Sequence, residues 1–356
     1  MTDVSADPAP IRVVIAEDSP VTREYLKYLV ERAGGFEVVG VAADGAAGVE
    51  LAQRLRPDVV LMDIQMPRMN GYEATRRIME RTPTPIVLVS ASLSRDEVGM
   101  SFEALRAGAL TVLEKPVGLD HPQTTAVAEE MLSTLRLMAE VKVVRRWPQA
   151  PPPAPLPPPP PARALPMRQA RLVAIGASTG GPAVLGEILG GLPAGLGASV
   201  LVVQHIAAGF VSGLAEWLGG QTPLTVKVAE AGEPLCAATV YLAPDGHQLG
   251  VTRDQRISLT TEAAVDGFRP SATHLFESVA RVLPQSSVGV LLSGMGRDGA
   301  AGLRALRDAG GLTIAQDRET SVIFGMPAEA IRLGAAAYIL PPEEIAVLIG
   351  QVARAR

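Results

Sequence analysis

The sequence predicts an α/β protein with two doubly wound domains, because short apolar runs alternate with amphipathic segments in both halves of the chain. Its 356 residues exceed what one ordinary core accommodates. A proline-rich stretch, WPQAPPPAPLPPPPPARALP at 147–166, separates the halves. Proline fixes φ and lacks an amide donor, so this stretch predicts an extended linker, with a docking site for a proline-binding module as the alternative.

These observations predict the domain boundaries. We expect a first domain over 10–130 and a second domain over 169–354. The intervening residues 131–168 would hold the end of a helix and the proline-rich linker.

The first half contains five short runs that are apolar throughout, which is typical of strands buried on both faces of a parallel sheet. They cover 11–16, 38–41, 59–62, 86–89 and 110–113. Amphipathic segments that predict helices lie at 20–33, 45–56, 71–81, 96–107 and 123–141. Such βα units predict a five-stranded, parallel, doubly wound sheet of the flavodoxin-like type.

The same alternation resumes after the linker and predicts a second doubly wound sheet. Strands are expected at 171–176, 199–204, 239–243, 288–292, 312–315 and 337–340. Helices are expected at 182–191, 210–219, 271–282, 300–309 and 326–333. The segment 245–262 has short alternating pieces instead, and predicts a small β-hairpin inserted into the domain.

Composition and charge narrow the class of protein. Apolar residues make up 47% and charged residues 19% of the chain, as in ordinary globular proteins. The net charge of −5 gives no sign of a nucleic-acid-binding surface. The polar N-terminus does not resemble a signal peptide, and no run reaches the roughly 18 apolar residues of a membrane span. Cys236 is the single cysteine, which excludes an intrachain disulfide, so we expect a cytoplasmic protein without membrane insertion.

Four strand ends of the first half carry polar side chains that suit one chemistry. They are Glu17 and Asp18, Asp63, Ser90 and Lys115. The carboxyl ends of parallel strands meet at one edge of a sheet, so these side chains should converge. Clustered carboxylates attract a hard divalent cation such as Mg²⁺, and a carboxylate beside the cation can accept a phosphoryl group. The alternative is a set of ordinary loop acids.

The segments AEDSP, LMDIQMPRMNG, VSA and EKP resemble the response-regulator receiver family, over residues 11 to about 130. The resemblance implies that Asp63 accepts a phosphoryl group from a histidine kinase. It also implies that Mg²⁺ is bound by Asp18, Asp63 and the backbone carbonyl of Gln65, with water-mediated help from Glu17.

The resemblance extends to the residues that respond to phosphorylation. It implies that Ser90 is the switch hydroxyl and that Lys115 pairs with the phosphoryl oxygens. Val112 stands where receivers often carry an aromatic switch residue. The aromatic rotamer signal is therefore absent, which leaves the path of activation open.

The second half opens with a strand that runs into a glycine-rich turn. The sequence LVAIGASTGGP places Ser178 in a G-x-S-x-G pattern between a strand and a helix. Such a turn exposes a serine hydroxyl at the rim of the sheet. Similar turns also cradle phosphates in nucleotide-binding folds, so the motif alone fits both kinds of site. The acid expected about 20 residues further on in a dinucleotide site is missing, which favours the hydrolase.

A nucleophilic serine needs a base, and the base needs an orienting acid. Among the four histidines, His205 follows the next strand and should lie at the same rim as Ser178. Asp298 follows a later strand, in a glycine-rich loop that allows close approach. The alternative for Asp298 is the N-cap of the helix that follows it. We predict a triad of these three residues, in an order that differs from ordinary α/β-hydrolases.

Six segments of the second half resemble the chemotaxis protein-glutamate methylesterases, over residues 170 to about 354. They are AIGASTGGP, VVQH, YLAPDGHQL, FRPSATHLFESVA, LLSGMGRDGA and VIFGMPAEA. The resemblance implies a phosphorylation-regulated serine esterase that hydrolyses glutamate methyl esters and deamidates glutamines. It implies that the backbone amides of Thr179 and Met295 hold the oxyanion and that this step needs no metal.

The resemblance also implies two partners. A chemotaxis-type histidine kinase would donate the phosphoryl group, and methylated chemoreceptors would be the substrate. Two alternatives stay open at this point. One is a receiver-gated module that acts by binding alone, and the other is a related hydrolase of a chemosensory pathway that does not control motility.

Overall fold

The computed structural model of the chain describes residues 9–90, 95–116, 124–141, 143 and 169–354. The chain divides into two compact units, Met1–Pro152 and Pro153–Arg356. The predicted linker at 147–166 lies outside the described residues. No helix in the described ranges is long and apolar enough to cross a membrane.

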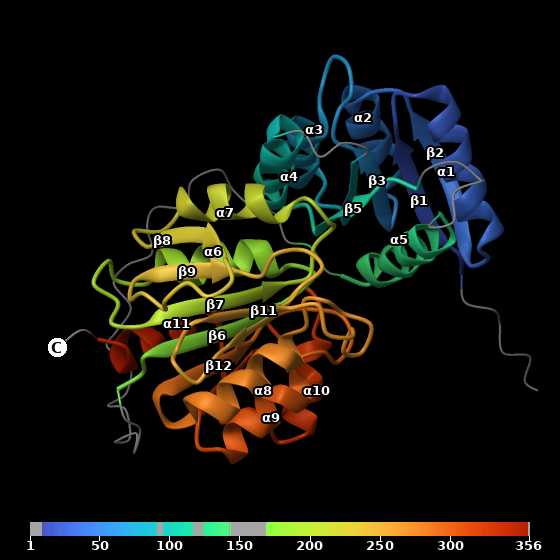
Figure 1. Cartoon of the computed structure of the whole chain (residues 1–356). Helices are drawn as coiled ribbons and strands as arrows, with labels where there is room; N and C mark the ends of the chain where they lie inside the picture. Colours follow the sequence, from blue (N-terminus) through green and yellow to red (C-terminus); the bar gives the residue numbers. More distant parts are fainter. Residues whose placement is uncertain (1–8, 91–94, 117–123, 142, 144–168, 355–356) are drawn as a thin grey trace, which may run out of the picture. The chain divides into compact units, whose positions relative to one another are not determined.

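The first unit is a five-stranded parallel sheet whose strands lie in the order β2-β1-β3-β4-β5 (Figure 1). This confirms the predicted doubly wound sheet. The elements are β1 (Ile11–Ala16), α1 (Pro20–Arg32), β2 (Phe36–Ala42), α2 (Gly45–Leu55), β3 (Val59–Asp63), α3 (Gly71–Arg81), β4 (Ile86–Ser90), α4 (Arg95–Ala107), β5 (Thr111–Glu114) and α5 (Thr124–Ala139).

Local signals explain where these elements begin. Every residue of β3 and β4 is buried, as expected for central strands covered by helices on both faces. Three helices start at a side chain that accepts a hydrogen bond from an amide of the first turn. These N-cap residues are Ser19 for α1, Asp44 for α2 and Asn70 for α3.

The second unit contains a seven-stranded parallel sheet in the order β14-β13-β12-β6-β7-β9-β8. Helices α8, α9 and α10 cover one face, and α6, α7 and α11 cover the other (Figure 1). The elements are β6 (Leu172–Ala177), α6 (Gly181–Gly190), β7 (Ser199–Gln204), α7 (Val211–Gly219), β8 (Thr225–Val228), β9 (Thr239–Leu242), β10 (Gln248–Val251), β11 (Ile257–Thr260), α8 (Ala272–Val282), the 3-10 turn η1 (Pro284–Ser286), β12 (Ser287–Leu291), α9 (Ala300–Asp308), β13 (Leu312–Gln316), α10 (Met326–Arg332), β14 (Tyr338–Leu340) and α11 (Pro342–Val352).

Strands β10 and β11 form a separate antiparallel pair, which confirms the predicted hairpin insertion. Two regular elements of this unit were not predicted. Strand β8 is an edge strand that is only partly buried, so it lacks the apolar run of its neighbours. Helix α11 begins with Pro342 at its first position and two glutamates in its first turn, which are ordinary helix-start signals.

The order of strands positions the chemistry of the second unit. Strand β6 lies between β12 and β7, and all three run parallel. The loops that follow these three strands therefore leave the sheet side by side at one edge. Ser178, His205 and Asp298 lie in these loops.

Candidate functional site

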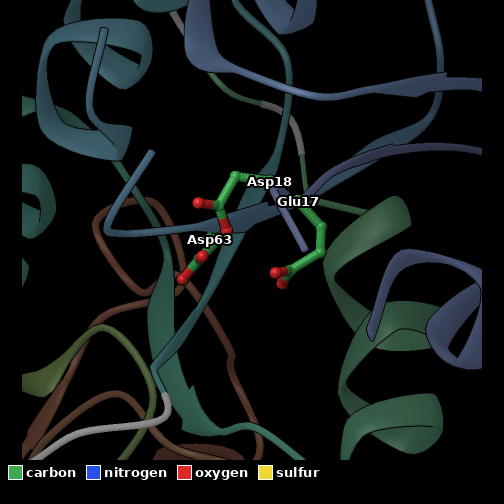
Figure 2. Close-up of side chains that lie close together, drawn as sticks. All are labelled: Glu17, Asp18 and Asp63. Atoms are coloured by element: carbon green, nitrogen blue, oxygen red, sulfur yellow. The ribbon is translucent and has the colours of Figure 1, made fainter. Parts of the chain in front are cut away.

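The first group of polar side chains lies at the carboxyl ends of β1, β3 and β5. Glu17, Asp18 and Asp63 offer carboxylate oxygens that all lie within 4.8 Å of one another (Figure 2). Lys115 follows β5, and its Nζ lies 2.9 Å from Glu17 Oε2 and 3.0 Å from Asp63 Oδ1. The structure therefore brings together the three acids and the lysine that the sequence placed at strand ends.

This cluster contains more negative than positive groups, because it combines three carboxyl groups with one lysine. Burial raises the pKa of Glu17 and of Asp63, and Lys115 opposes part of this shift. The neighbouring carboxylates raise these pKa values further: Asp63 acts on Glu17, and Asp18 acts on Asp63. Burial lowers the pKa of Lys115, but Asp63 and Glu17 outweigh this and the net shift is upward. Lys115 thus pairs with the two buried carboxylates, Glu17 and Asp63, and the exposed Asp18 lies beside them. The residual negative charge of the three acids suits a divalent cation.

The remaining predicted receiver residues lie around this cluster. Ser90 ends β4 and is buried, and its carbonyl accepts a hydrogen bond from the Lys115 amide at 2.9 Å. Gln65 is exposed in the loop between β3 and α3, two positions after Asp63. Val112 is buried within β5, where it pairs with Leu88 of β4.

Ser178 follows β6 directly and lies half-buried, three residues before α6 begins. Its amide donates to the carbonyl of Ser293 at 3.0 Å, and its carbonyl accepts from the amide of Gly181 at 2.8 Å. The turn is closed by Gly180 with φ +79°, a conformation that side chains other than glycine rarely adopt. The backbone therefore holds Ser178 against the loop after β12.

His205 occupies the equivalent position after β7. Ala177 and Gln204 pair across β6 and β7, and the His205 amide donates to the Ala177 carbonyl at 2.9 Å. The buried Gln204 amide group donates to the carbonyls of Ser178 at 2.7 Å and His205 at 2.8 Å, and so ties the two loops together. Ser178 and His205 are thus neighbours across two hydrogen-bonded strands.

Asp298 is fully buried, and four donors surround its carboxylate. Oδ2 lies 3.0 Å from His205 Nε2 and accepts from the Ala272 amide at 2.7 Å. Oδ1 accepts from the Ser271 hydroxyl at 2.7 Å and from the Thr273 amide at 3.1 Å. The carboxylate therefore sits at the N-terminal end of α8, where amides and the helix dipole favour negative charge.

The alternative role of Asp298 as N-cap of the next helix is wrong. Helix α9 begins at Ala300 with Gly299 as its N-cap, and no side chain caps it. Burial raises the pKa of Asp298, but the bonds from His205, Ser271 and the Ala272 amide outweigh burial and lower the pKa to about 2. Asp298 is therefore an anion at any pH near neutrality.

The hydrogen bond to Asp298 assigns the two ring nitrogens of His205. An ionised carboxylate accepts hydrogen bonds and donates none, so Nε2 carries the proton. Nδ1 is buried and has no hydrogen-bond partner among the described residues. In neutral imidazole this nitrogen is the basic one, which makes Nδ1 the proton acceptor of the site.

The two predicted oxyanion donors lie in the loops that follow β6 and β12. Thr179 follows Ser178 in the chain, and Met295 lies in the loop after β12 with 42% of its surface exposed. Within the part of the chain that the structure describes, no hydrogen bond uses the amide of Thr179 or of Met295. Both amides are therefore free to donate to a ligand oxygen.

Several residues that shape this site were missed in the sequence. The ring of Phe268 stacks on the imidazole of His205, and Ser271 and Gln204 anchor the acid and the two loops. Phe268 and Ser271 lie within the segment FRPSATHLFESVA. No local pattern marks their contacts, because the partners lie on other strands.

Comparison with known proteins identifies both units. The family model described as CheB methylesterase matches residues 173–349, and the response regulator receiver domain matches residues 13–126. A "Protein-glutamate methylesterase/protein-glutamine glutaminase 4" of Myxococcus xanthus is 52% identical over 318 residues, which are 89% of this chain and 90% of that protein. This chain belongs to the protein-glutamate methylesterase/protein-glutamine glutaminase family. A relative of the same printed name from Geobacter metallireducens is 48% identical over 344 residues, which are 96% of this chain and 99% of that protein.

A solved structure supports the fold of the second unit. The catalytic domain of Thermotoga maritima CheB methylesterase is 36% identical, with a TM-score of 0.50. The match covers 51% of this chain and 98% of that domain. The methylesterase chain therefore combines a receiver domain with a methylesterase-type α/β domain.

Proposed function

We propose that this chain is a phosphorylation-regulated serine esterase that hydrolyses glutamate methyl esters on chemoreceptors and deamidates receptor glutamines in chemotaxis adaptation. The observation that carries the proposal is the hydrogen bond between His205 Nε2 and Asp298, with Nδ1 unpartnered among the described residues. His205 and Ser178 follow the paired strands β7 and β6. Family membership supports the choice of substrate.

The first half of the reaction forms an acyl-enzyme. Ser178 Oγ attacks the carbonyl carbon of the glutamate side-chain ester, and His205 Nδ1 takes the hydroxyl proton. Asp298 stays ionised, accepts from Nε2–H throughout and offsets the positive charge of the imidazolium. The amides of Thr179 and Met295 hold the negative carbonyl oxygen. The bond between the former carbonyl carbon and the methoxy oxygen then breaks, Nδ1–H protonates that oxygen, and methanol leaves.

The second half restores the enzyme. Water attacks the acyl carbon while His205 Nδ1 accepts its proton, and the same proton passes to Ser178 Oγ as the acyl bond breaks. The product is a free glutamate carboxylate. A glutamine side chain follows the same steps, with ammonia in place of methanol as the first leaving group.

The receiver unit would supply the regulation. Asp63 attacks the phosphorus of the kinase phosphohistidine, forms an acyl phosphate and displaces the histidine. Glu17, Asp18 and Asp63 fit Mg²⁺, because their oxygens cluster and the ammonium group of Lys115 offsets the charge of Glu17 and Asp63 only in part. They would hold it together with the Gln65 carbonyl, and bound Mg²⁺ would neutralise charge on the phosphoryl oxygens.

Two residues of the receiver respond to the new phosphoryl group. Lys115 Nζ, 3.0 Å from Asp63 Oδ1, pairs with a phosphoryl oxygen, and the Ser90 hydroxyl donates to another. Phosphorylation then raises the population of the state in which Ser178 is accessible to the receptor. The buried Val112 takes the place of an aromatic switch, so the signal passes through other contacts.

We assign the receiver domain to 10–130, the helix end and linker to 131–168, and the catalytic domain to 169–354. The family matches over 13–126 and 173–349 are in keeping with these boundaries. The partners would be a chemotaxis-type histidine kinase and methylated chemoreceptors, and a cytoplasmic location stays a prediction.

Release of methanol tests the proposal directly. Full-length protein is mixed with receptor membranes that carry radiolabelled methyl esters, and volatile label is timed. Wild type should release methanol, and Ser178→Ala should lower the rate by at least about 10³-fold. Equal release by both proteins would remove Ser178 from the mechanism, and no release by the wild type would favour a module that acts by binding alone.

A further inference from the structure

Phe268 covers one face of the His205 ring. The two ring centroids lie 4.0 Å apart and the planes differ by 3°, so the rings are stacked in parallel. An aromatic face attracts an imidazolium ion more strongly than a neutral imidazole. The stack therefore becomes stronger when His205 accepts a proton.

A tight turn fixes where the Phe268 ring lies. Val265 and Phe268 exchange both backbone hydrogen bonds, at 3.0 Å and 2.9 Å. The two residues between them, Asp266 and Gly267, have φ of +50° and +89°. A two-residue connection with positive φ at both positions is a type I′ turn, and Asp-Gly is among its favoured sequences. The backbone of Phe268 is thus held in a tight turn.

A buried side-chain amide joins the 265–268 turn to the start of α8, whose residues donate hydrogen bonds to Asp298. Gln248 is fully buried, and its Nε2 donates to the carbonyls of Ala263 at 3.1 Å and Phe268 at 3.3 Å. Its Oε1 accepts from the Ser271 amide at 2.9 Å. Ser271 in turn donates to Asp298, so one chain of hydrogen bonds links the backbone of Phe268 to the acid.

An ion pair joins the 265–268 turn to the loop that contains Asp298. Arg297 Nε and Nη2 donate to Asp266 at 3.3 Å and 3.0 Å. The Arg297 side chain is 72% exposed, so this pair contributes little stability by itself. Gln248 is the stronger anchor, because its bonds are buried.

Within the described ranges, the His205 ring makes one hydrogen bond, from Nε2 to Asp298. Rotation of the ring about its Cβ–Cγ bond would break this hydrogen bond and turn Nδ1 at the same time. We propose that Phe268 is a positioning residue for the esterase reaction: its ring restricts this rotation and so holds Nδ1 in the orientation from which it accepts the Ser178 proton. The expected effect on kcat rests on the proposed function, whereas the expected effect on the orientation of the His205 ring does not.

Kinetics of full-length variants test the proposal. Phe268→Leu keeps an apolar side chain but removes the flat face, whereas Phe268→Tyr keeps the face. In the methanol assay, the Leu variant should lose about 10- to 100-fold in kcat with KM changed by less than about twofold, because a small misplacement of the base is costly. The Tyr variant should stay within about threefold of wild type. Equal impairment of both variants, or wild-type kcat in the Leu variant, would overturn the proposal.

Nuclear magnetic resonance of the His205 ring supplies a readout that needs no substrate. The Nε2 proton bound to Asp298 should exchange with water faster in Phe268→Leu than in wild type and Phe268→Tyr, measured in a Ser178→Ala background. Unchanged exchange in the Leu variant would overturn the positioning role. A wild type that releases no methanol would instead refute the esterase function and leave this comparison intact.

Folding is checked by thermal unfolding of each variant. If the Leu variant does not fold, Phe268→Met replaces it, because methionine fills a similar volume without a flat face. The Met variant is then compared with the Tyr variant in both assays, with the same expected and contrary results.

Discussion

At the scale of single residues, Asp298 has the most hydrogen-bonded side chain of the three predicted triad residues. Each of its oxygens accepts two hydrogen bonds, and three of the four donors come from the first residues of α8 and the residue before it. Protein donors replace water completely, so the buried anion costs little. The donors also fix the carboxylate plane, which fixes the direction from which His205 must approach.

Replacing Asp298 by asparagine tests the assignment of the ring nitrogens. An asparagine amide facing His205 would donate to Nε2, so the imidazole proton would move to Nδ1 and the base would be lost. We expect a loss of about 10³- to 10⁴-fold in kcat with the fold retained. The measurement is timed methanol release. Asp308→Asn, on the exposed side of α9, is the matched control and should retain wild-type turnover.

The same carboxylate predicts how stability depends on pH. Folding lowers its pKa from 3.8 to about 2, so its stabilising contribution is fully present above pH 3.8 and is lost as the pH falls towards 2. The shift corresponds to about 2 kcal/mol of unfolding free energy. Urea unfolding of wild type and Asp298→Asn should show a stability difference that narrows by this amount between about pH 5 and pH 2. A difference that stays constant would contradict the assigned pKa.

At the scale of elements, the site depends on three loops that leave adjacent strands. The loop after β12 approaches Ser178 so closely that only glycine fits at position 294. A Cβ there would lie 2.7 Å from Ser178 Cβ and would also strike Met326 Sδ. Gly294 is held in place as well, because its amide and carbonyl bond to Ile323 and Met326 at 3.0 Å and 2.9 Å. Neither loop can move aside easily.

Gly294→Ala should therefore damage activity more than stability. We expect kcat/KM to fall by more than about 10²-fold, since the nucleophile is displaced. The unfolding free energy should fall by about 1–3 kcal/mol, as for other overpacked sites. Gly195→Ala is the control, because a Cβ at that exposed position meets open space. Methanol release and urea unfolding measure the two effects, and full activity in Gly294→Ala would show that the loops are less constrained than these contacts indicate.

At the scale of the whole molecule, one chain carries two parallel sheets with separate chemistry. Each sheet presents its polar residues at the carboxyl ends of its strands, and each unit has its own buried core. The receiver cluster binds cation and phosphoryl group in our proposal, and the second unit cleaves the ester. Regulation requires that the state of Asp63 changes access to Ser178.

A phosphodonor should therefore stimulate the wild-type enzyme and leave Asp63→Asn unaffected. Acetyl phosphate with Mg²⁺ should raise the initial rate of methanol release at least about fivefold, an effect of about 1 kcal/mol. Asp58→Asn, just before β3 and outside the acidic cluster, is the matched control and should still respond. Stimulation of Asp63→Asn would place the phosphoryl acceptor at another residue.

Much of this protein was determined by its sequence alone. Apolar runs with polar residues at their ends predict both sheets, because parallel strands must be buried and their carboxyl ends share an edge. The same rule pointed to Asp63, Lys115, Ser178 and His205 as site candidates. Edge strand β8 was not predicted, because its residues are only partly buried and do not form an apolar run.

Only the tertiary structure showed that Asp298 does not cap the next helix and that it bonds to Nε2 of His205 rather than to Nδ1. These residues are 93 positions apart, and their contact depends on β12, β6 and β7 lying next to one another. The stacking of Phe268 likewise depends on a turn at 265–268 that meets the loop after β7. Hydrophobic periodicity reports only on neighbours along the chain, so contacts made by the order of strands are visible only after the sheet has formed.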